Sequence, residues 1–219
     1  MSENPNELTI ENSVVVLIDH QPGVALMTMP PSHSDLVNNV AGLAEAAKAL
    51  GVPTVLTTVG AAGGPLVDPI FKEIRAAFPD LTPIDRVTTA AWSHPEVRAA
   101  VQATGRRKLV MAGLSTDVCL AQTALGALKD GYEVYFVTDC SAGVTPEAHQ
   151  DAKTRLSMAG ARPINWVAVV AEWAPDYTSP EKQAITEVMA RRGGAASFYT
   201  DFVLDQVAAG VAKAPEYLS

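Results

Sequence analysis

The sequence predicts a doubly wound α/β fold, with a mostly parallel sheet and helices on both faces in a Rossmann-like three-layer arrangement. Apolar runs of strand length alternate along the chain with segments of helical period, which is the pattern of a parallel sheet covered by helices. The chain has 219 residues, of which 48% are hydrophobic, so it is long enough for one sizeable core. We expect one domain over residues 1–173 and a helical extension over residues 174–219.

The first half of the chain contains three predicted strands and three predicted helices. The run VVVLI over residues 14–18 is the clearest strand. A helical stripe follows over residues 36–50, with Ser34 able to cap it and Gly51 able to end it. The other elements expected here are strands over 53–59 and 82–85 and helices over 68–78 and 96–104, the last with Ser93 as its cap and Pro95 in its first turn.

The second half continues the alternation and then changes pattern. Its predicted elements are strands over 107–111, 133–138 and 162–166 and helices over 116–130 and 146–159, each helix followed by a glycine. Beyond the linker at 174–180, helical patterns cover 181–192 and 201–213. This extension has no obvious place in the sheet. It either docks on a neighbouring subunit or covers its own domain, and the sequence favours neither.

Composition excludes several classes of partner. The net charge is −8 and Lys and Arg form no large cluster, which argues against a surface that binds nucleic acid. The N-terminus is polar and acidic, and no apolar run approaches the ~20 residues of a membrane span. The four histidines are scattered, and no Gly-rich nucleotide loop occurs. We therefore expect a cytoplasmic protein with a small-molecule partner, no membrane contact, no metal and no cofactor.

Two residues that can react together follow strands of the predicted sheet. Cys119 lies six residues after Gly113, at the start of a helical pattern, and Asp19 directly follows the first strand. The carboxyl ends of parallel strands meet at one edge of the sheet, and the start of a helix favours a thiolate. A carboxylate beside a thiol can accept its proton and later return it. The alternatives are that Asp19 caps a turn and that Cys119 only packs.

The second cysteine, Cys140, also follows a strand but precedes a loop rather than a helix. A small apolar filler is therefore its simpler interpretation. A thiol redox pair of Cys119 and Cys140 is a separate hypothesis, and the absence of a Cys-x-x-Cys sequence counts against it.

Three segments together resemble the isochorismatase-like superfamily of cysteine hydrolases, which includes nicotinamidase and N-carbamoylsarcosine amidase. They are residues 14–21, 113–119 and 137–139, and both their order and their spacing match. The Asp-His-Gln sequence at 19–21, the loop at 58–66 and the extension are most similar to the YcaC-type branch of hydrolases. The resemblance covers roughly residues 10–172 and implies a homo-oligomer such as an octamer.

The resemblance implies a catalytic triad of Asp, Lys and Cys, in which Asp19 and Cys119 match directly. The third position holds Arg86 instead of lysine, followed six residues later by the aromatic Trp92. Arginine keeps its charge and can lower the pKa of a thiol, but it cannot carry a proton. Turnover is lost if the family lysine must shuttle a proton, and it survives if only a positive charge is required.

The resemblance also implies a cis peptide bond between Leu114 and Ser115, with the backbone amides of Ser115 and Cys119 forming an oxyanion hole. Such amides stabilise a tetrahedral oxyanion by roughly 3 kcal/mol per donor. Nicotinamidases further carry an Asp-x-His-x-x-x-His metal site after the second strand. Residues 57–64 contain no such ligand here, which disfavours a metal-dependent nicotinamidase.

The sequence thus predicts a cysteine-dependent hydrolase that attacks a small amide or related acyl carbon through a thioester. In it Asp19 deprotonates Cys119 and Arg86 supports the thiolate. We expect the pocket wall to contain Gln21, Trp92, Thr116 and the loop at 27–31, because they flank the predicted edge of the sheet. The alternative is a catalytically silent binding or assembly protein that keeps the fold.

Overall fold

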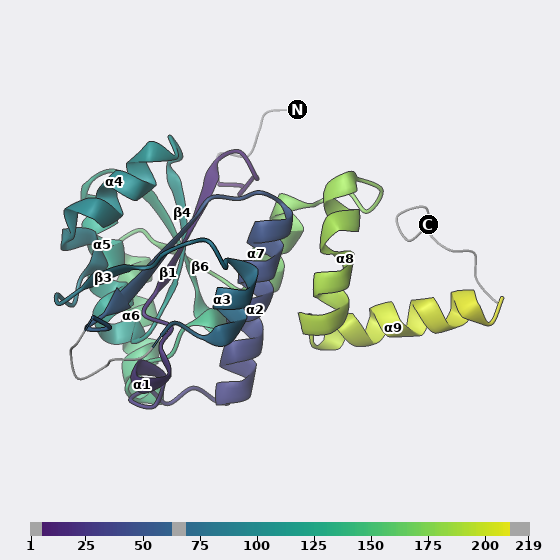
Figure 1. Cartoon of the computed structure of the whole chain (residues 1–219), viewed down its shortest axis with the longest axis horizontal. Helices are drawn as coiled ribbons and strands as arrows, with labels where there is room; N and C mark the ends of the chain where they lie inside the picture. The colour runs from purple at the N-terminus through teal and green to yellow at the C-terminus, as the bar shows by residue number, and fades with distance from the viewer. Residues whose placement is uncertain (1–5, 63–68, 211–219) are drawn as a thin grey trace.

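The computed structural model describes residues 6–62 and 69–210. Its centre is one parallel sheet of six strands in the order β3-β2-β1-β4-β5-β6, which confirms the predicted fold class (Figure 1). The strands are β1 (Ser13–Ile18), β2 (Thr54–Val59), β3 (Ile84–Arg86), β4 (Lys108–Gly113), β5 (Glu133–Val137) and β6 (Arg162–Ile164).

Helices connect these strands and extend the chain beyond the sheet. The α-helices are α1 (Pro22–Ala25), α2 (His33–Ala49), α3 (Lys72–Ala77), α4 (Pro95–Ala103), α5 (Ala121–Lys129), α6 (Pro146–Met158), α7 (Trp166–Trp173), α8 (Pro180–Arg192) and α9 (Ala195–Ala208). A π-helix, η2 (Thr116–Leu120), precedes α5, and two short 3₁₀ segments are η1 (Ala91–Ser93) and η3 (Thr138–Cys140).

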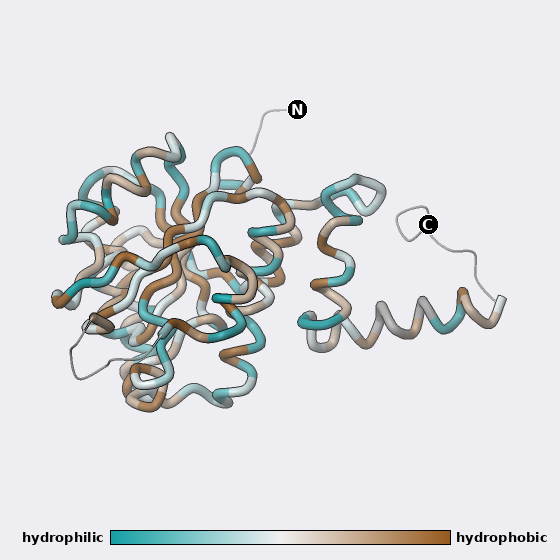
Figure 2. Tube along the Cα trace, viewed as in Figure 1, coloured by the Kyte–Doolittle hydropathy of each residue, from teal (hydrophilic) through white to brown (hydrophobic). Residues whose placement is uncertain are grey.

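The two faces of the sheet bury two separate clusters. Successive residues of a strand point to opposite faces, so Val15 and Leu17 pack with α2, α3 and α7, whereas Val14 and Val16 pack with α4, α5 and α6. Figure 1 shows these helix groups on the two sides of the sheet, and Figure 2 shows the hydrophobic strands between them. All six residues of β1 are buried, as expected for a central parallel strand.

The strand order places a topological switch point where β1 and β4 end. From β1 the chain moves to β2 and β3 on one side, and β4 begins the other half of the sheet. Ile18 and Gly113, the last residues of β1 and β4, are paired in register. Ligands of open α/β sheets bind at this kind of switch point. Asp19 follows Ile18 directly, and η2 begins three residues after Gly113.

The structure differs from the sequence predictions at several element boundaries. The strand predicted over 162–166 ends at Ile164, because the Asn165 side chain accepts a hydrogen bond from the Ala168 amide and caps α7. Neither α7 nor the four-residue α1 was predicted. Ser32 rather than Ser34 caps α2, and His94 rather than Ser93 stands at the N-cap of α4. The helix predicted over 116–130 begins as the π-helix η2.

The C-terminal extension divides into a docked helix and a projecting one. Ile185 of α8 is fully buried in the core cluster that contains α2, and Glu45 of α2 pairs with Arg191 and Arg192. By contrast, α9 runs away from the domain (Figure 1). This helix begins earlier than the predicted helix over 201–213, whose last residues lie outside the described residues.

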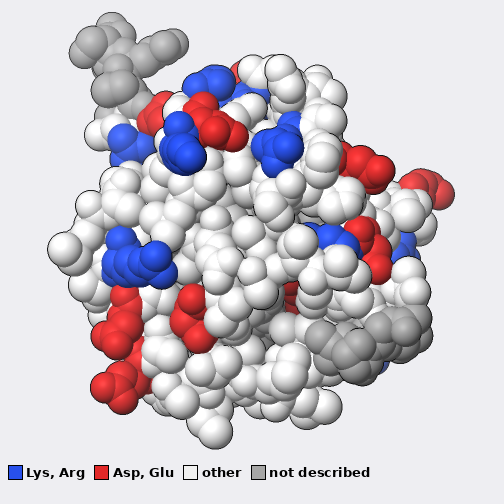
Figure 3. Space-filling model, turned by 90° about the vertical axis from the view of Figure 1, so that its left-hand side faces the viewer, with Lys and Arg blue, Asp and Glu red and all other residues white. Residues whose placement is uncertain are grey.

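The surface carries mixed charges. On the face shown in Figure 3, Lys and Arg side chains lie among Asp and Glu side chains around a mostly uncharged centre. Within residues 6–62 and 69–210, no helix is both long enough and apolar enough to cross a bilayer.

Candidate active site

Asp19 lies at the carboxyl end of β1 in a backbone conformation that few residues adopt. Its φ angle is +58°, in the left-handed region where aspartate is among the tolerated side chains. The Asp19 amide donates to the Thr57 carbonyl, and the Asp19 carbonyl accepts from the Gln21 amide. These bonds turn the chain at the end of the strand and hold the fully buried carboxylate at the switch point between β1 and β4.

Arg86, the last residue of β3, binds this carboxylate through both of its terminal nitrogens. Its Nη1 donates to Asp19 Oδ1 at 2.5 Å and its Nη2 donates to Asp19 Oδ2 at 2.6 Å. The same nitrogens also donate to the backbone carbonyls of Thr58 and Thr89. Both charged side chains are fully buried. A guanidinium has five N–H donors in a rigid fork, so this set of bonds needs an arginine and exceeds what a lysine could make.

The Asp19 carboxylate retains acceptor capacity on one oxygen. Oδ1 accepts from Arg86 and from the Thr57 hydroxyl at 3.0 Å. Oδ2 accepts from Arg86, and an ionised carboxylate oxygen can accept about two hydrogen bonds. Oδ2 can therefore take a proton from a neighbouring thiol while the ion pair with Arg86 is kept.

Cys119 is the fourth residue of η2 and is 9% exposed. Burial, the Asp19 charge and a hydrogen bond to Asp19 raise the pKa of its thiol to about 12, against the opposing effects of Arg86 and of the Ser115 backbone. The thiol is therefore protonated at neutral pH. Arg86 lowers this pKa, which is the direction expected of a group that supports the thiolate, but burial and the Asp19 charge outweigh it.

Alkylation of Cys119 by iodoacetamide should show this raised pKa. Since only the thiolate reacts, we expect the rate constant to rise about tenfold per pH unit from neutral pH upward, with no plateau near the usual thiol pKa of about 8.5. Peptide mass analysis separates Cys119 from the fully buried Cys140. A rate constant that levels off below pH ~9 would mean that Arg86 outweighs burial and Asp19 in setting the pKa of Cys119. The free protein would then hold a substantial fraction of thiolate near neutral pH.

The backbone beside Cys119 has the form that the resemblance implies. The peptide bond between Leu114 and Ser115 is cis. The Ser115 carbonyl accepts from the Leu120 amide, closing the π-helical turn, while the Ser115 backbone is a hydrogen-bond partner of the Cys119 sulfur. The backbone of Ser115 thus lies beside the Cys119 sulfur, and the oxyanion hole that the resemblance implies stays a prediction.

Gln21 and Thr116 lie beside this cluster, but their side chains bond to protein groups. The Gln21 amide accepts from the Val59 N–H at 2.8 Å and donates to the Val59 carbonyl at 3.3 Å, so it braces the end of β2. The Thr116 hydroxyl is 2.9 Å from His149 Nδ1. Both residues are fully buried, and these bonds favour a role in shaping the pocket wall.

Trp92 is buried in the same apolar cluster as Cys119, and its own contacts are with α5. Its indole N–H donates to Asp130 at 2.8 Å, and its ring packs on Gly126, where an added Cβ would lie 2.8 Å from the ring. Gly126 lies seven residues after Cys119, about 10 Å further along the helix. These contacts show that Trp92 anchors η1 to α5, and its place in the pocket wall stays a prediction.

Several residues that hold the site were not found from the sequence. They are Thr57 and Thr58, which bond to Asp19 and Arg86, Asp85, which accepts from the Ala61 and Ala62 amides, and His149, which bonds to Thr116. Their signal is three-dimensional, since each comes from another strand or helix.

His20 is a further titratable residue next to Asp19. His20 is fully buried, its Nε2 contacts the Cys140 carbonyl at 2.9 Å, and burial lowers its pKa to about 4. In the described part of the chain, no three His, Cys, Asp or Glu side chains are grouped as metal ligands. Part of the loop at 58–66 falls outside the described residues.

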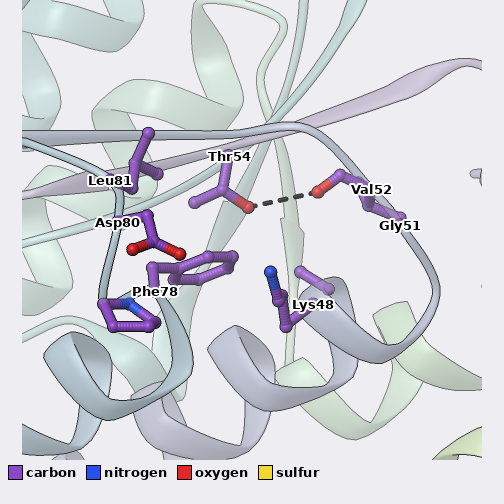
Figure 4. A pocket seen from close by; sticks show the side chains of 9 residues that line it. Lys48, Gly51, Val52, Thr54, Phe78, Asp80 and Leu81 are labelled. Carbon is purple, nitrogen blue, oxygen red and sulfur yellow. Dashed lines mark hydrogen bonds between the residues drawn. The ribbon is translucent and has the colours of Figure 1, made fainter.

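A separate pocket lies at the opposite edge of the sheet. Lys48, Phe78 and Asp80 face this hollow of about 360 Å³ (Figure 4), and Thr54, the first residue of β2, lines it. Thr57, which contacts Asp19, lies three residues further on, about 10 Å along the strand. This pocket is therefore not part of the candidate site.

Comparisons with known proteins agree with this architecture. An isochorismatase domain model matches residues 13–168. The protein named Probable hydrolase YcaC of Escherichia coli K12 is 37% identical over 169 residues, covering 76% of this chain and 79% of that protein.

Two solved structures cover nearly the whole chain. YcaC from Pseudomonas aeruginosa, described with hexane-2,5-diol and covalent acrylamide, aligns at TM-score 0.85 and 30% identity over 92% of this chain and 99% of its own. YcaC from Escherichia coli, described as an octameric hydrolase of unknown specificity, aligns at TM-score 0.84 and 30% identity over 93% and 99%. The matched residues 13–168 include all six strands, Asp19 and Cys119. The chain therefore belongs to the isochorismatase family of hydrolases.

Proposed function

We propose that this hydrolase uses Cys119 to attack a small amide or related acyl compound and forms a thioester. The observation that carries the proposal is that three side chains lie together, from the residue after β1, the end of β3 and η2. Asp19 is fixed by Arg86 through two short hydrogen bonds and lies close enough to the Cys119 thiol to raise its pKa. A nucleophile, a base and a group that orients the base are the arrangement that nucleophilic catalysis requires.

Asp19 performs the proton transfers in this mechanism. As the sulfur attacks the acyl carbon, its proton moves to Asp19 Oδ2 and the carbonyl oxygen becomes an oxyanion held by the Ser115 and Cys119 amides. The protonated Asp19 then gives that proton to the leaving amine when the C–N bond breaks. Water attacks the thioester with Asp19 as general base, releasing the acid and restoring the thiol.

Arg86 has a fixed electrostatic role in this scheme. It stays protonated throughout, and four of its five N–H donors are engaged by Asp19, Thr58 and Thr89. It holds Asp19 in place and offsets part of its charge. A lysine that shuttles a proton is therefore not required, which favours the enzyme over the catalytically silent alternative.

A screen of small amides, carbamoyl compounds and hydroxamates tests the proposal. We expect turnover of at least one class by the wild-type protein and none by Cys119→Ser, since an alcohol beside Asp19 is a much weaker nucleophile than a thiol at neutral pH. Cys140→Ser is the matched control and should keep activity. Equal turnover by Cys119→Ser and wild type contradicts the mechanism.

We also propose that the protein forms a homo-oligomer through α9. Phe198 and Phe202 are 78% and 55% exposed and lie four residues apart, on one side of the projecting helix. An apolar side of this kind marks a protein contact. The octameric description of the Escherichia coli relative supports assembly of this chain as well.

Replacing Phe198 and Phe202 together by Ser should shift the protein to a smaller species in size-exclusion chromatography with light scattering. The exposed Met158 of α6 provides the control, and Met158→Ser should leave the molar mass unchanged. An unchanged mass in the double variant contradicts a role for α9 in assembly.

A further inference from the structure

Three hydrogen bonds tie the segment that carries Cys119 to the loop before α6 and to the first turns of α6. The Thr116 amide donates to the Ala142 carbonyl at 2.8 Å, and the Val144 amide donates to Asp117 Oδ1 at 3.2 Å. The third bond joins the Thr116 hydroxyl to His149 Nδ1 at 2.9 Å. Thr116 and Asp117 are the first two residues of η2, so the three bonds set where this turn begins.

The loop before α6 and the π-helix η2 lie close together at Gly143. A Cβ at Gly143 would lie 2.7 Å from the His149 backbone nitrogen and 3.0 Å from Asp117 Oδ1. Gly143 therefore lets α6 approach η2 closely enough for the imidazole to reach a hydroxyl that is fully buried.

We propose that His149 is a positioning residue for Cys119, and that its neutral imidazole accepts the Thr116 hydroxyl hydrogen through Nδ1. Thr116 lies between Ser115, an oxyanion-hole donor of the proposed function, and the nucleophile. The inference rests on that proposed function. In this tautomer the imidazole carries its own hydrogen on Nε2, and Nδ1 is the acceptor that the buried hydroxyl needs.

Protonation of His149 reverses this hydrogen bond. Both nitrogens of the imidazolium are donors, so Nδ1 then donates to Thr116 Oγ1 and the hydroxyl hydrogen must find another acceptor. The charged groups facing His149 are Lys153 on its own helix, Asp117 on η2, and Asp35 and Asp139, which line the same pocket of about 690 Å³ as His149 and Lys153. Burial and Lys153 lower the pKa of His149, opposed by Asp117, so the neutral form dominates at neutral pH.

Nitrogen-15 NMR of the His149 ring tests the hydrogen bond without turnover. We expect the tautomer with hydrogen on Nε2 and a pKa below the usual ~6.5. Thr116→Val, which removes the hydroxyl donor at similar volume, should weaken that tautomer preference. An Nδ1–H tautomer in the wild type overturns the proposal, whether or not any amide is hydrolysed.

Kinetics with an amide from the screen test the positioning role. His149→Leu should lower kcat about five- to tenfold with KM unchanged, the effect of losing one buried hydrogen bond. His149→Asn keeps an acceptor near the position of Nδ1 but does not titrate, so it should restore kcat at neutral pH. It should also remove the loss of rate seen in the wild type as His149 becomes protonated in acid.

His94, at the N-cap of α4, is the matched control, and His94→Leu should change neither kcat nor the pH profile. A normal kcat in His149→Leu, or an acid loss that persists in His149→Asn, overturns the positioning role. If the wild type turns over no amide in the screen, the proposed function fails on its own, and the NMR result still decides the hydrogen bond.

Discussion

Arg86→Met is expected to destabilise the folded protein by about 3–5 kcal/mol, because it leaves the Asp19 carboxylate buried without its partner. Both side chains of this ion pair are fully buried and joined by two hydrogen bonds. The matched control is Arg162→Met. Arg162 pairs with Glu133 at 2.9 Å, but the two side chains are 39% and 40% exposed, and such surface pairs contribute at most about 1 kcal/mol.

Urea unfolding of both variants and the wild type at one protein concentration measures this difference. Equal and small effects would mean that Arg86 does not stabilise a buried charge. Removing both charges in Asp19→Asn/Arg86→Met should recover part of the lost stability, since no uncompensated charge is then buried and asparagine tolerates the left-handed backbone at this position. No recovery in the double variant would assign the loss to packing instead.

Asp19→Asn should move two rates at the catalytic site in opposite directions. Turnover should fall by about 10²- to 10⁴-fold, because the proposed general base is gone. Alkylation of Cys119 at mildly alkaline pH should become faster. The Asp19 charge and hydrogen bond raise the pKa of the thiol, whereas Arg86 lowers it, so removing Asp19 lowers that pKa and increases the thiolate fraction.

Thr57→Val is the control for Asp19→Asn. It removes one hydrogen bond to Asp19 at similar volume and keeps every charge, so it should change both rates by much less. Circular dichroism checks that Asp19→Asn remains folded with Arg86 unpaired. A parallel fall of turnover and alkylation would indicate a distorted site and contradict the assignment of Asp19 as the base.

The central strands and the layer order were predictable because their signal is local. The apolar run that forms β1 and the glycines that end the strongest helices are read from adjacent residues. The helix α7 was missed because its Val-rich sequence favours a strand, although Asn165 is a recognisable cap. Packing of Trp166, Val169 and Val170 into the core overrides the weak helix propensity of this segment.

The chemistry of the site was only partly predictable. Asp19 and Cys119 follow strands of one parallel sheet, so their proximity follows from topology. Arg86 was identified through the resemblance, but its two bonds to Asp19 and the resulting thiol pKa depend on side-chain geometry. His149 lies 33 residues after Thr116 in the sequence, and the bond between them exists only because Gly143 allows α6 to approach η2.

Hydroxylamine partitioning tests the thioester intermediate most directly. Two amides of the turnover screen that share an acyl group but differ in leaving amine should give the same ratio of hydroxamate to acid, because both pass through one acyl-Cys119 enzyme. This holds whether acylation or deacylation limits the rate. A ratio that changes with the leaving amine, or product formation that persists in Cys119→Ala, would contradict the proposed mechanism.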